Sequence, residues 1–308
     1  MRVLFWGTPE FAAAPLRALL GEGFEVIGVV TQPDKPKGRA RNPTPPPIKQ
    51  IALEEGLTCF QPERPKDSEF VEMLGVLKPD ISIVVAYGHI LPKTIIDLPE
   101  LGTLNIHASL LPELRGAAPI QAAIRQGLIE TGVSIMRMVP ALDAGPVILN
   151  ASTPILDDET YGELQLRLSE LGALTLIEAL TLISIGEAKE TPQDESRATF
   201  APKVSRADAR IDWSLPAIEV ARAIRAYDPK PGAFTTLRGS DVKLFGAKTI
   251  MEAAGSVGEV LATDNELLVG CGAGAVRIAD VQPSGKSRMS AADWVRGRGI
   301  ARGDALGS

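Results

Sequence analysis

The fold is decided by residues 3–30, VLFWGTPEFAAAPLRALLGEGFEVIGVV, in which two short apolar runs flank a helical pattern. The first run, Val3 to Trp6, ends at Gly7, and the second covers Glu25 to Val30. Short continuous apolar runs are typical of strands that are buried on both faces of a parallel sheet. The stretch therefore predicts a strand, a crossover helix over Phe11 to Leu20 and a second, parallel strand.

Three more apolar runs, at 81–86, 102–107 and 132–138, continue this alternation with helical patterns. They predict a doubly wound α/β domain with a mostly parallel, Rossmann-like sheet. A long helical pattern follows from Glu159 to Ile185. Its apolar side is expected to include Leu164, Leu168, Leu171 and Leu174.

The pattern of apolar and polar residues changes after residue 186. Residues 187–208 are polar and irregular, which predicts a linker between a domain over 1–186 and a second one over 209–308. In the second part a helix candidate at Pro216 to Ala226 precedes five short strand-like runs, so we expect a small OB-like β-barrel. The runs cover 233–237, 242–245, 258–262, 266–269 and 275–279. Gly270 to Ala275 imitates a dinucleotide loop, but a strand pattern follows it and a hairpin turn is expected.

Composition and charge narrow the class of protein. Of 308 residues, 45% are apolar and 23% charged, which is typical of a globular protein. The net charge of −6 argues against a protein that coats nucleic acid by bulk attraction, but residues 1–200 carry −9 and residues 201–308 carry +3. A polyanionic partner is therefore expected on the second part or on a local basic segment.

The sequence also predicts a cytoplasmic location. Cys59 and Cys271 give neither a disulfide framework nor a zinc site. The apolar run at the N-terminus is too short for a secretory signal, and no stretch reaches the ~20 apolar residues of a membrane span. With two histidines and no ligand-spaced cluster, we expect no metal site.

Polar residues at the ends of predicted strands are the candidates for chemistry. Asn105 and His107 lie on one face of a strand and project where α/β sheets bind ligands. Asp143 lies in a Pro- and Gly-bounded loop after the next strand. Between His107 and Asp143 in the sequence, residues 108–121 form an apolar loop that either packs against the rest of the domain or lines a ligand pocket. A satisfied turn is the structural alternative for both His107 and Asp143.

A basic segment, Pro33 to Lys49, contains six prolines and five Lys or Arg residues against one Asp. Such a segment is neither helix nor central strand, and a long loop of this kind is functional or merely solvated. Its charges offer phosphate contacts on an acidic half of the chain.

Together these motifs resemble the formyltransferase family that uses 10-formyltetrahydrofolate. The resemblance rests on Asn105-Ile106-His107, the Ser109 to Pro112 stretch and Asp143, and it continues through residues 7–12, 31–36, 85–92 and 209–213. It implies that Asn105, His107 and Asp143 are catalytic. It also implies two sets of binding residues. The folate-contacting set is His89, Ile90, Leu91, Ser109, Leu110, Leu111 and Pro112, and the tRNA-contacting set is Lys35, Lys37, Arg39 and Arg41.

The implied reaction moves a formyl group from 10-formyltetrahydrofolate to the α-amino group of methionine on initiator tRNA, without a covalent enzyme intermediate. Asn105 would donate to the developing oxyanion, while His107 would either donate beside it or shuttle a proton. Asp143 would orient His107 or order a water. We expect a monomer. The alternatives are an amino-sugar formyltransferase, a formyltetrahydrofolate hydrolase or a noncatalytic RNA-binding protein; a nicotinamide oxidoreductase lacks its glycine loop here.

Overall fold

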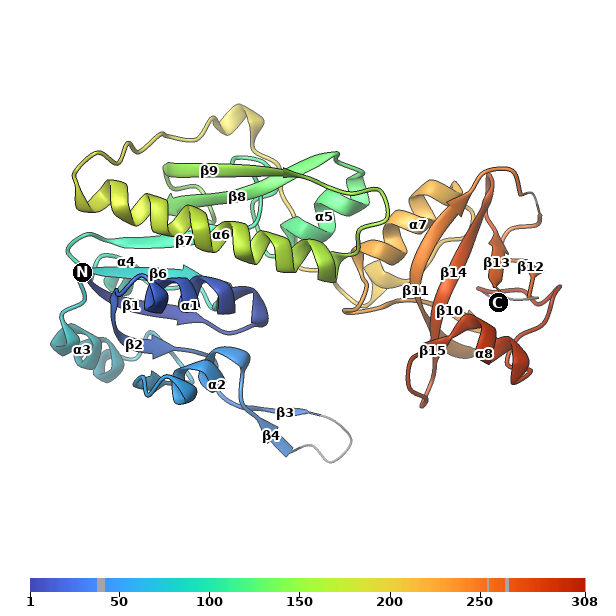
Figure 1. Cartoon of the computed structure of the whole chain (residues 1–308), viewed down its shortest axis with the longest axis horizontal. Helices are drawn as coiled ribbons and strands as arrows, with labels where there is room; N and C mark the ends of the chain where they lie inside the picture. The colour runs from blue at the N-terminus through green and yellow to red at the C-terminus, as the bar shows by residue number, and fades with distance from the viewer. Residues whose placement is uncertain (38–41, 254, 264–265, 308) are drawn as a thin grey trace. The chain divides into compact units, whose positions relative to one another are not determined.

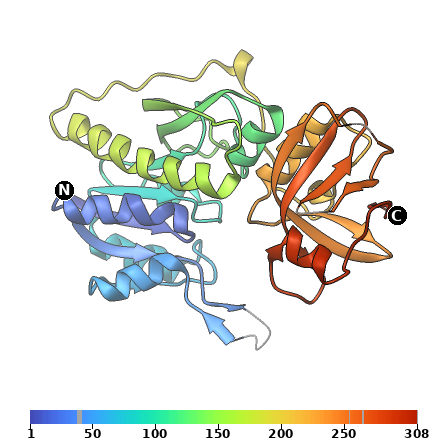
Figure 2. The ribbon, with the colours of Figure 1, turned by 45° about the vertical axis from the view of Figure 1, so that its right-hand side comes forward.

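The computed structural model describes residues 1–37, 42–253, 255–263 and 266–307, and the chain divides into two compact units (Figure 1 and Figure 2). The first unit comprises Met1–Gly116, Thr131–Thr153 and Gln165–Phe200. The second comprises Ala117–Glu130, Pro154–Leu164 and Ala201–Ser308. No helix among the described residues is long and apolar enough to cross a membrane.

A seven-stranded sheet in the order β5-β2-β1-β6-β7-β8-β9 forms the centre of the first unit. Its strands are β1 (Arg2–Gly7), β2 (Glu25–Val30), β5 (Cys59–Phe60), β6 (Ile81–Val85), β7 (Thr103–His107), β8 (Glu130–Arg137) and β9 (Val147–Pro154). The pairs from β5 to β7 are parallel, whereas β8 runs antiparallel to β7. The predicted mostly parallel Rossmann-like sheet is therefore confirmed, with one antiparallel addition.

The central strands are buried because helices cover the sheet. Side chains from Val3 to Trp6 are at most 1% exposed, and those of Ile81 and Ile83 are fully buried. The covering helices are α1 (Ala13–Gly21), α2 (Pro47–Glu54), α3 (Ser68–Leu77), α4 (Lys93–Ile96) and α6 (Tyr161–Ser184), with short 3-10 turns at Glu10–Ala12 and Glu195–Arg197.

The long helix α6 lies along the sheet, as Figures 1 and 2 show. Its Ser169 hydroxyl donates to the Phe11 carbonyl at 2.8 Å, and a Cβ on Gly172 would lie 3.0 Å from Ile106 of β7. The predicted helix is confirmed, but placing Leu174 on its apolar side is wrong because that side chain is 71% exposed. At 3.6 residues per turn, the stripe through Leu168 continues at Leu176, and Leu174 falls outside it.

The basic segment forms a two-stranded hairpin, β3 (Lys35–Lys37) and β4 (Asn42–Thr44), as Figure 1 shows. The expectation that the whole segment lacks helix is wrong at its end, because α2 begins at Pro47 and contains Lys49. Proline is tolerated there because the N–H groups of the first helical residues have no intrahelical acceptor, so the missing N–H of proline costs no helical hydrogen bond.

The second unit contains a curled antiparallel sheet in the order β10-β11-β14-β13-β12, with β15 paired to β14. Its elements are α5 (Pro119–Gln126), a 3-10 turn at Ala207–Ala209, α7 (Ala217–Ala226), β10 (Ala233–Leu237), β11 (Ser240–Ile250), β12 (Val260–Ala262), β13 (Leu267–Gly270), β14 (Ala275–Pro283), β15 (Met289–Ser290) and α8 (Ala291–Arg296). The turn after Gly270 joins two antiparallel strands, so the predicted hairpin is confirmed.

The C-terminal residues connect the two edges of this sheet. Val260 of β12 exchanges backbone hydrogen bonds with Gly303 and Asp304, at 2.8 and 2.9 Å. Gly307 donates to the Thr236 carbonyl of β10 at 2.8 Å. The segment 303–307 thereby satisfies edge groups that would otherwise be unpaired, which closes the sheet in the manner of a small barrel.

Candidate active site

The candidate residues gather at the carboxyl edge of the parallel strands. β1, β6 and β7 are adjacent and parallel, so the segments after Gly7, Val85 and His107 emerge at the same edge. Thr8 and Gln32 side chains both donate to the Tyr87 carbonyl, at 3.0 and 3.1 Å. These bonds tie together the loops that follow β1, β2 and β6.

Asn105 and His107 share one face of β7, as the strand alternation predicts. The Asn105 side chain is half-buried and has no hydrogen-bond partner among the residues that the structure describes. His107 is 5% exposed. Its Nε2 lies 3.0 Å from the Leu114 carbonyl oxygen, and its Nδ1 lies 3.7 Å from Oδ2 of Asp143. The three predicted catalytic residues therefore lie in the same region of the first unit.

The Leu114 carbonyl determines which nitrogen of His107 carries the proton. A carbonyl oxygen only accepts, so Nε2 must carry the hydrogen, and neutral His107 presents a lone pair at Nδ1 to Asp143. Burial lowers the pKa of His107 below its usual value of 6.5, and the Asp143 charge and the Leu114 hydrogen bond oppose this shift. Neutral His107 is thus a proton acceptor at Nδ1, and its protonated form would be stabilised by the Asp143 carboxylate.

Asp143 itself is held in an uncommon backbone conformation, with φ at 47°. Its Oδ2 accepts the Gly116 N–H at 2.8 Å. The Gln193 amide donates to the backbone carbonyls of Asp143 and Gly145, at 2.8 and 2.7 Å. Two different segments therefore support the loop that carries this carboxylate.

Residues 191–199, here called the return segment, supply this support although the sequence predicts a linker there. Thr191 exchanges both backbone hydrogen bonds with Val147, at 2.8 Å each. The Thr199 carbonyl accepts from the Arg115 N–H at 2.9 Å, and the Thr199 hydroxyl accepts from the Leu114 N–H at 2.8 Å. The return segment is therefore packed against both site loops within the first unit.

Sequence reasoning missed Arg115, Gln193 and Glu195. Arg115 is only 3% exposed, and its guanidinium donates to Gln193 and, through two nitrogens, to Glu195 at 2.8 and 2.9 Å. An arginine within an apolar loop was a usable signal, because a buried guanidinium needs partners. Gln193 and Glu195 lie in a polar stretch that carries no such signal.

The predicted folate-contacting residues lie at the same edge. The Ser109 hydroxyl donates to the Glu113 carbonyl at 2.6 Å, and Ser134 of β8 bridges Ser109 and Leu111 at 2.7 and 3.0 Å. These contacts fix the loop, which includes a cis peptide before Pro112, and leave Leu110 half exposed.

In the segment after β6, neighbouring apolar side chains differ in their burial. Ile90 is 86% exposed, whereas Leu91 is buried. His89 is exposed, with its ring 5.6 Å from the Tyr87 ring. Burial raises the pKa of Tyr87 to about 12, so that phenol stays protonated.

The base of the basic hairpin is fixed by charged contacts. Lys49 lies 2.9 Å from both carboxylate oxygens of Asp34, and Gln61 donates to Asp34 at 2.8 Å. These contacts lower the pKa of Asp34, the Gln61 hydrogen bond most strongly. Lys35 donates to the Gln32 side chain at 2.5 Å, and the backbone of Lys37 pairs with Asn42. Arg39 and Arg41 lie outside the described residues.

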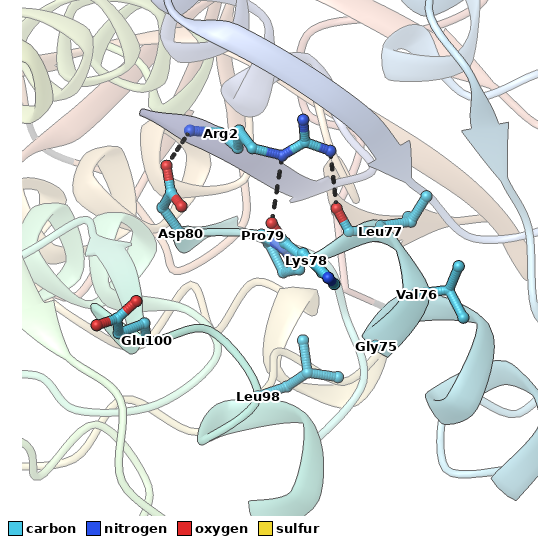
Figure 3. A pocket seen from close by; sticks show the side chains of 9 residues that line it. All are labelled: Arg2, Gly75, Val76, Leu77, Lys78, Pro79, Asp80, Leu98 and Glu100. Atoms are coloured by element: carbon cyan, nitrogen blue, oxygen red, sulfur yellow. Dashed lines mark hydrogen bonds between the residues drawn. The ribbon is translucent and has the colours of Figure 1, made fainter.

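A separate pocket of about 640 Å³ lies at the opposite, amino end of the strands (Figure 3). Figure 3 shows Arg2 and Asp80 at its wall, and Arg2 donates to the carbonyls of Leu77 and Lys78. The side chains of Arg2 and Asp80 are thus engaged by other groups of the protein, and the pocket is lined by none of the candidate residues. Among the described residues there is also no group of three metal-ligating side chains.

The fold and the site define an α/β enzyme whose polar groups meet at the carboxyl edge of a mostly parallel sheet. Residues 1–180 match the family described as formyl transferase, and residues 203–299 match the formyl transferase C-terminal domain. The chain therefore belongs to the formyl transferase family.

Individual relatives extend over the full length. A methionyl-tRNA formyltransferase of Methylococcus capsulatus is 47% identical over 309 residues, covering 100% of both chains. That of Bacillus velezensis is 44% identical, covering 99% of this chain and 98% of its own. HypX from Aquifex aeolicus, solved in complex with tetrahydrofolic acid, shares the fold with a TM-score of 0.68 at 24% identity. The match covers 96% of this chain and 47% of HypX, so this chain spans about half of that protein.

Proposed function

We propose that this protein transfers the formyl group of 10-formyltetrahydrofolate to the α-amino group of methionine esterified to initiator tRNA. The observation that carries the proposal is the placement of His107 Nδ1 against Asp143, beside Asn105, in a chain with full-length methionyl-tRNA formyltransferase relatives. The same relatives make an amino-sugar acceptor or simple hydrolysis of the donor less supported.

The residues fit a flat, partly apolar donor. Exposed Ile90 follows β6 and half-exposed Leu110 follows β7, so both offer apolar surface at the edge where the polar groups lie. We assign donor contacts to the backbone around His89 to Leu91 and to the Ser109 to Pro112 loop. The donor supplies the formyl group. The groups that stabilise the oxyanion and transfer the proton are side chains of this chain.

Three groups meet three chemical demands. The Asn105 amide donates an N–H to the oxygen on which negative charge develops. The proton that leaves the attacking amine is held at Nδ1 of His107, and Asp143 stabilises the imidazolium until the proton passes to the departing nitrogen. The amine attacks directly. No covalent bond to the enzyme is required.

The acceptor is held chiefly through its phosphates. We assign this role to Lys35, Lys37, Arg39 and Arg41 of the basic hairpin and to basic residues of 209–308. The catalytic part is 1–186, and 187–208 is the connection, whose residues 191–199 also pack against the site loops. Phosphate contacts predict an affinity for tRNA that falls steeply with salt. A cytoplasmic monomer stays our prediction.

One assay tests the proposal. The protein is incubated with 10-formyltetrahydrofolate and methionyl-tRNA, and N-formylmethionine is measured after deacylation. Formylmethionine is the expected product. Release of formate when tRNA is omitted would indicate a hydrolase, and tRNA binding without a folate-dependent product would indicate a noncatalytic RNA-binding protein.

A further inference from the structure

We propose that Gln193 is a positioning residue for the formyl transfer, because its side-chain amide holds the Asp143 loop beside His107. The inference rests on the proposed function for its kinetic test. Its physical basis is the set of contacts between the return segment and the two site loops.

The Gln193 amide uses its oxygen and its nitrogen on different partners. Its Oε1 accepts from Nε and Nη2 of Arg115, at 3.0 and 2.8 Å. Its Nε2 donates to the carbonyls of Asp143 and Gly145, at 2.8 and 2.7 Å. A guanidinium only donates and a carbonyl only accepts, so the orientation of the amide is fixed. Gln193 therefore joins a buried cation to the loop of the carboxylate.

Arg115 lies between the two residues that contact the catalytic pair. Its neighbour Leu114 accepts from His107 through its carbonyl, and its other neighbour Gly116 donates to Asp143. Arg115 is itself held by Gln193 and Glu195 and is nearly fully buried. Gln193 thus links the loop that fixes the tautomer of His107 to the loop that carries Asp143.

The Asp143 loop needs this link because its conformation is not intrinsically favoured. A non-glycine residue with φ at 47° is retained only where its surroundings determine it. Without the two Gln193 hydrogen bonds, the backbone of the Asp143 loop loses its contacts with the return segment, and Asp143 is held in this network by its side chain alone, through the Gly116 N–H and His107. A shift of about 1 Å at a catalytic group can reduce turnover about 100-fold.

The test compares Gln193→Glu, Gln193→Met and a matched control, Glu190→Gln. Glutamate keeps the acceptor for Arg115 but cannot donate to the two carbonyls, whereas methionine keeps the length and loses both functions. Glu190 lies close to the return segment in the sequence and pairs with Arg137 at the surface, without a contact to Asp143. Folding of each variant is checked by circular dichroism and urea unfolding.

In single-turnover and steady-state assays, both Gln193 variants should lose about 10- to 100-fold in kcat, with KM for donor and tRNA within about threefold. Amide exchange over residues 114–117 and 140–146 should accelerate in both variants. Glu190→Gln should leave all these quantities unchanged. A kcat within twofold of wild type in both variants, or a rise in KM at constant kcat, would overturn the proposal.

The exchange measurement separates the two hypotheses. If the wild-type protein forms no formylmethionine, the proposed function fails, and unchanged exchange in the Gln193 variants would still reject the positioning role. If the wild type is active and the variants fold but show normal turnover, only the positioning role fails.

Discussion

Replacing Asn105 by alanine should reduce turnover strongly while leaving the fold intact. The Asn105 side chain has no hydrogen-bond partner among the described residues and is half-buried, so truncation leaves no buried group unpaired. We therefore expect a change of less than about 1 kcal/mol in the free energy of unfolding. Loss of one oxyanion donor costs about 2.7–4 kcal/mol in the transition state, or roughly 10²- to 10³-fold in kcat.

A control on the same strand face isolates this effect. The Thr103 hydroxyl, two residues earlier on β7, donates to the Ile96 carbonyl at 2.8 Å in a buried position. Thr103→Val keeps the shape and loses that bond, which should cost about 0.5–1.5 kcal/mol in stability plus the desolvation of the carbonyl. Its turnover should stay near that of the wild type. Asn105→Ala should thus lose turnover with little loss of stability, whereas Thr103→Val should lose stability with little loss of turnover.

The assay is a single turnover with enzyme in excess over methionyl-tRNA and a saturating donor, quenched and analysed for formylmethionine. Unfolding in urea gives the stability of each variant. Near-normal transfer by Asn105→Ala would refute the oxyanion role. A loss of turnover in Thr103→Val equal to that of Asn105→Ala would show that the strand's integrity, and not its amide, is being measured.

Four further outcomes follow from the structure. Activity should fall on the acid side with a midpoint below 6.5, because burial lowers the pKa of His107 and only its neutral form accepts a proton; a midpoint above 6.5 in a pH-rate profile would contradict this. The unfolded state then binds the proton more tightly, so His107 should also reduce stability as pH falls below about 6.5, measured by urea unfolding of wild type against His107→Asn. Lys49→Met should raise KM for tRNA but not for the donor, since Lys49 and Asp34 fix the base of the hairpin; equal effects on both KM values would reject that role. Deleting residues 303–308 should lower the melting temperature of the second unit, because the edges of β10 and β12 lose their bridging bonds, and an unchanged calorimetric transition would show that they do not contribute.

The central strands were predictable because their residues carry the signal locally. Val3 to Trp6 and Ile81 to Val85 are continuous apolar runs, and such runs are stable only inside a covered sheet. The direction of β8 was not readable in the same way. Its run predicts a strand whichever neighbour it pairs with, and the antiparallel pairing to β7 depends on the path through α5.

The part of the candidate site that lies on or directly after a strand was predictable from the sequence. Asn105 and His107 share a face because alternation on β7 places them there, and the apolar Ser109 to Pro112 loop is anchored beside them. The hydrogen bonds from Arg115 to Gln193 and Glu195 span 78 and 80 residues of sequence. Periodicity reports burial within an element, whereas such long-range polar contacts have no periodic signature.

This difference explains why the sequence predicts only a linker for a polar stretch that packs against the loops of the candidate site. Asp143 is held at φ 47°, and the hydrogen bonds that support its loop come from Gly116 and Gln193, which are distant in the sequence. The return segment provides the Gln193 donors and also satisfies Arg115, which would otherwise be a buried unpaired cation. The polar side chains of Gln193, Glu195 and Thr199 are thus used in contacts with the two site loops, so a substitution at Gln193 should change kcat more than a substitution at an exposed polar residue without such contacts.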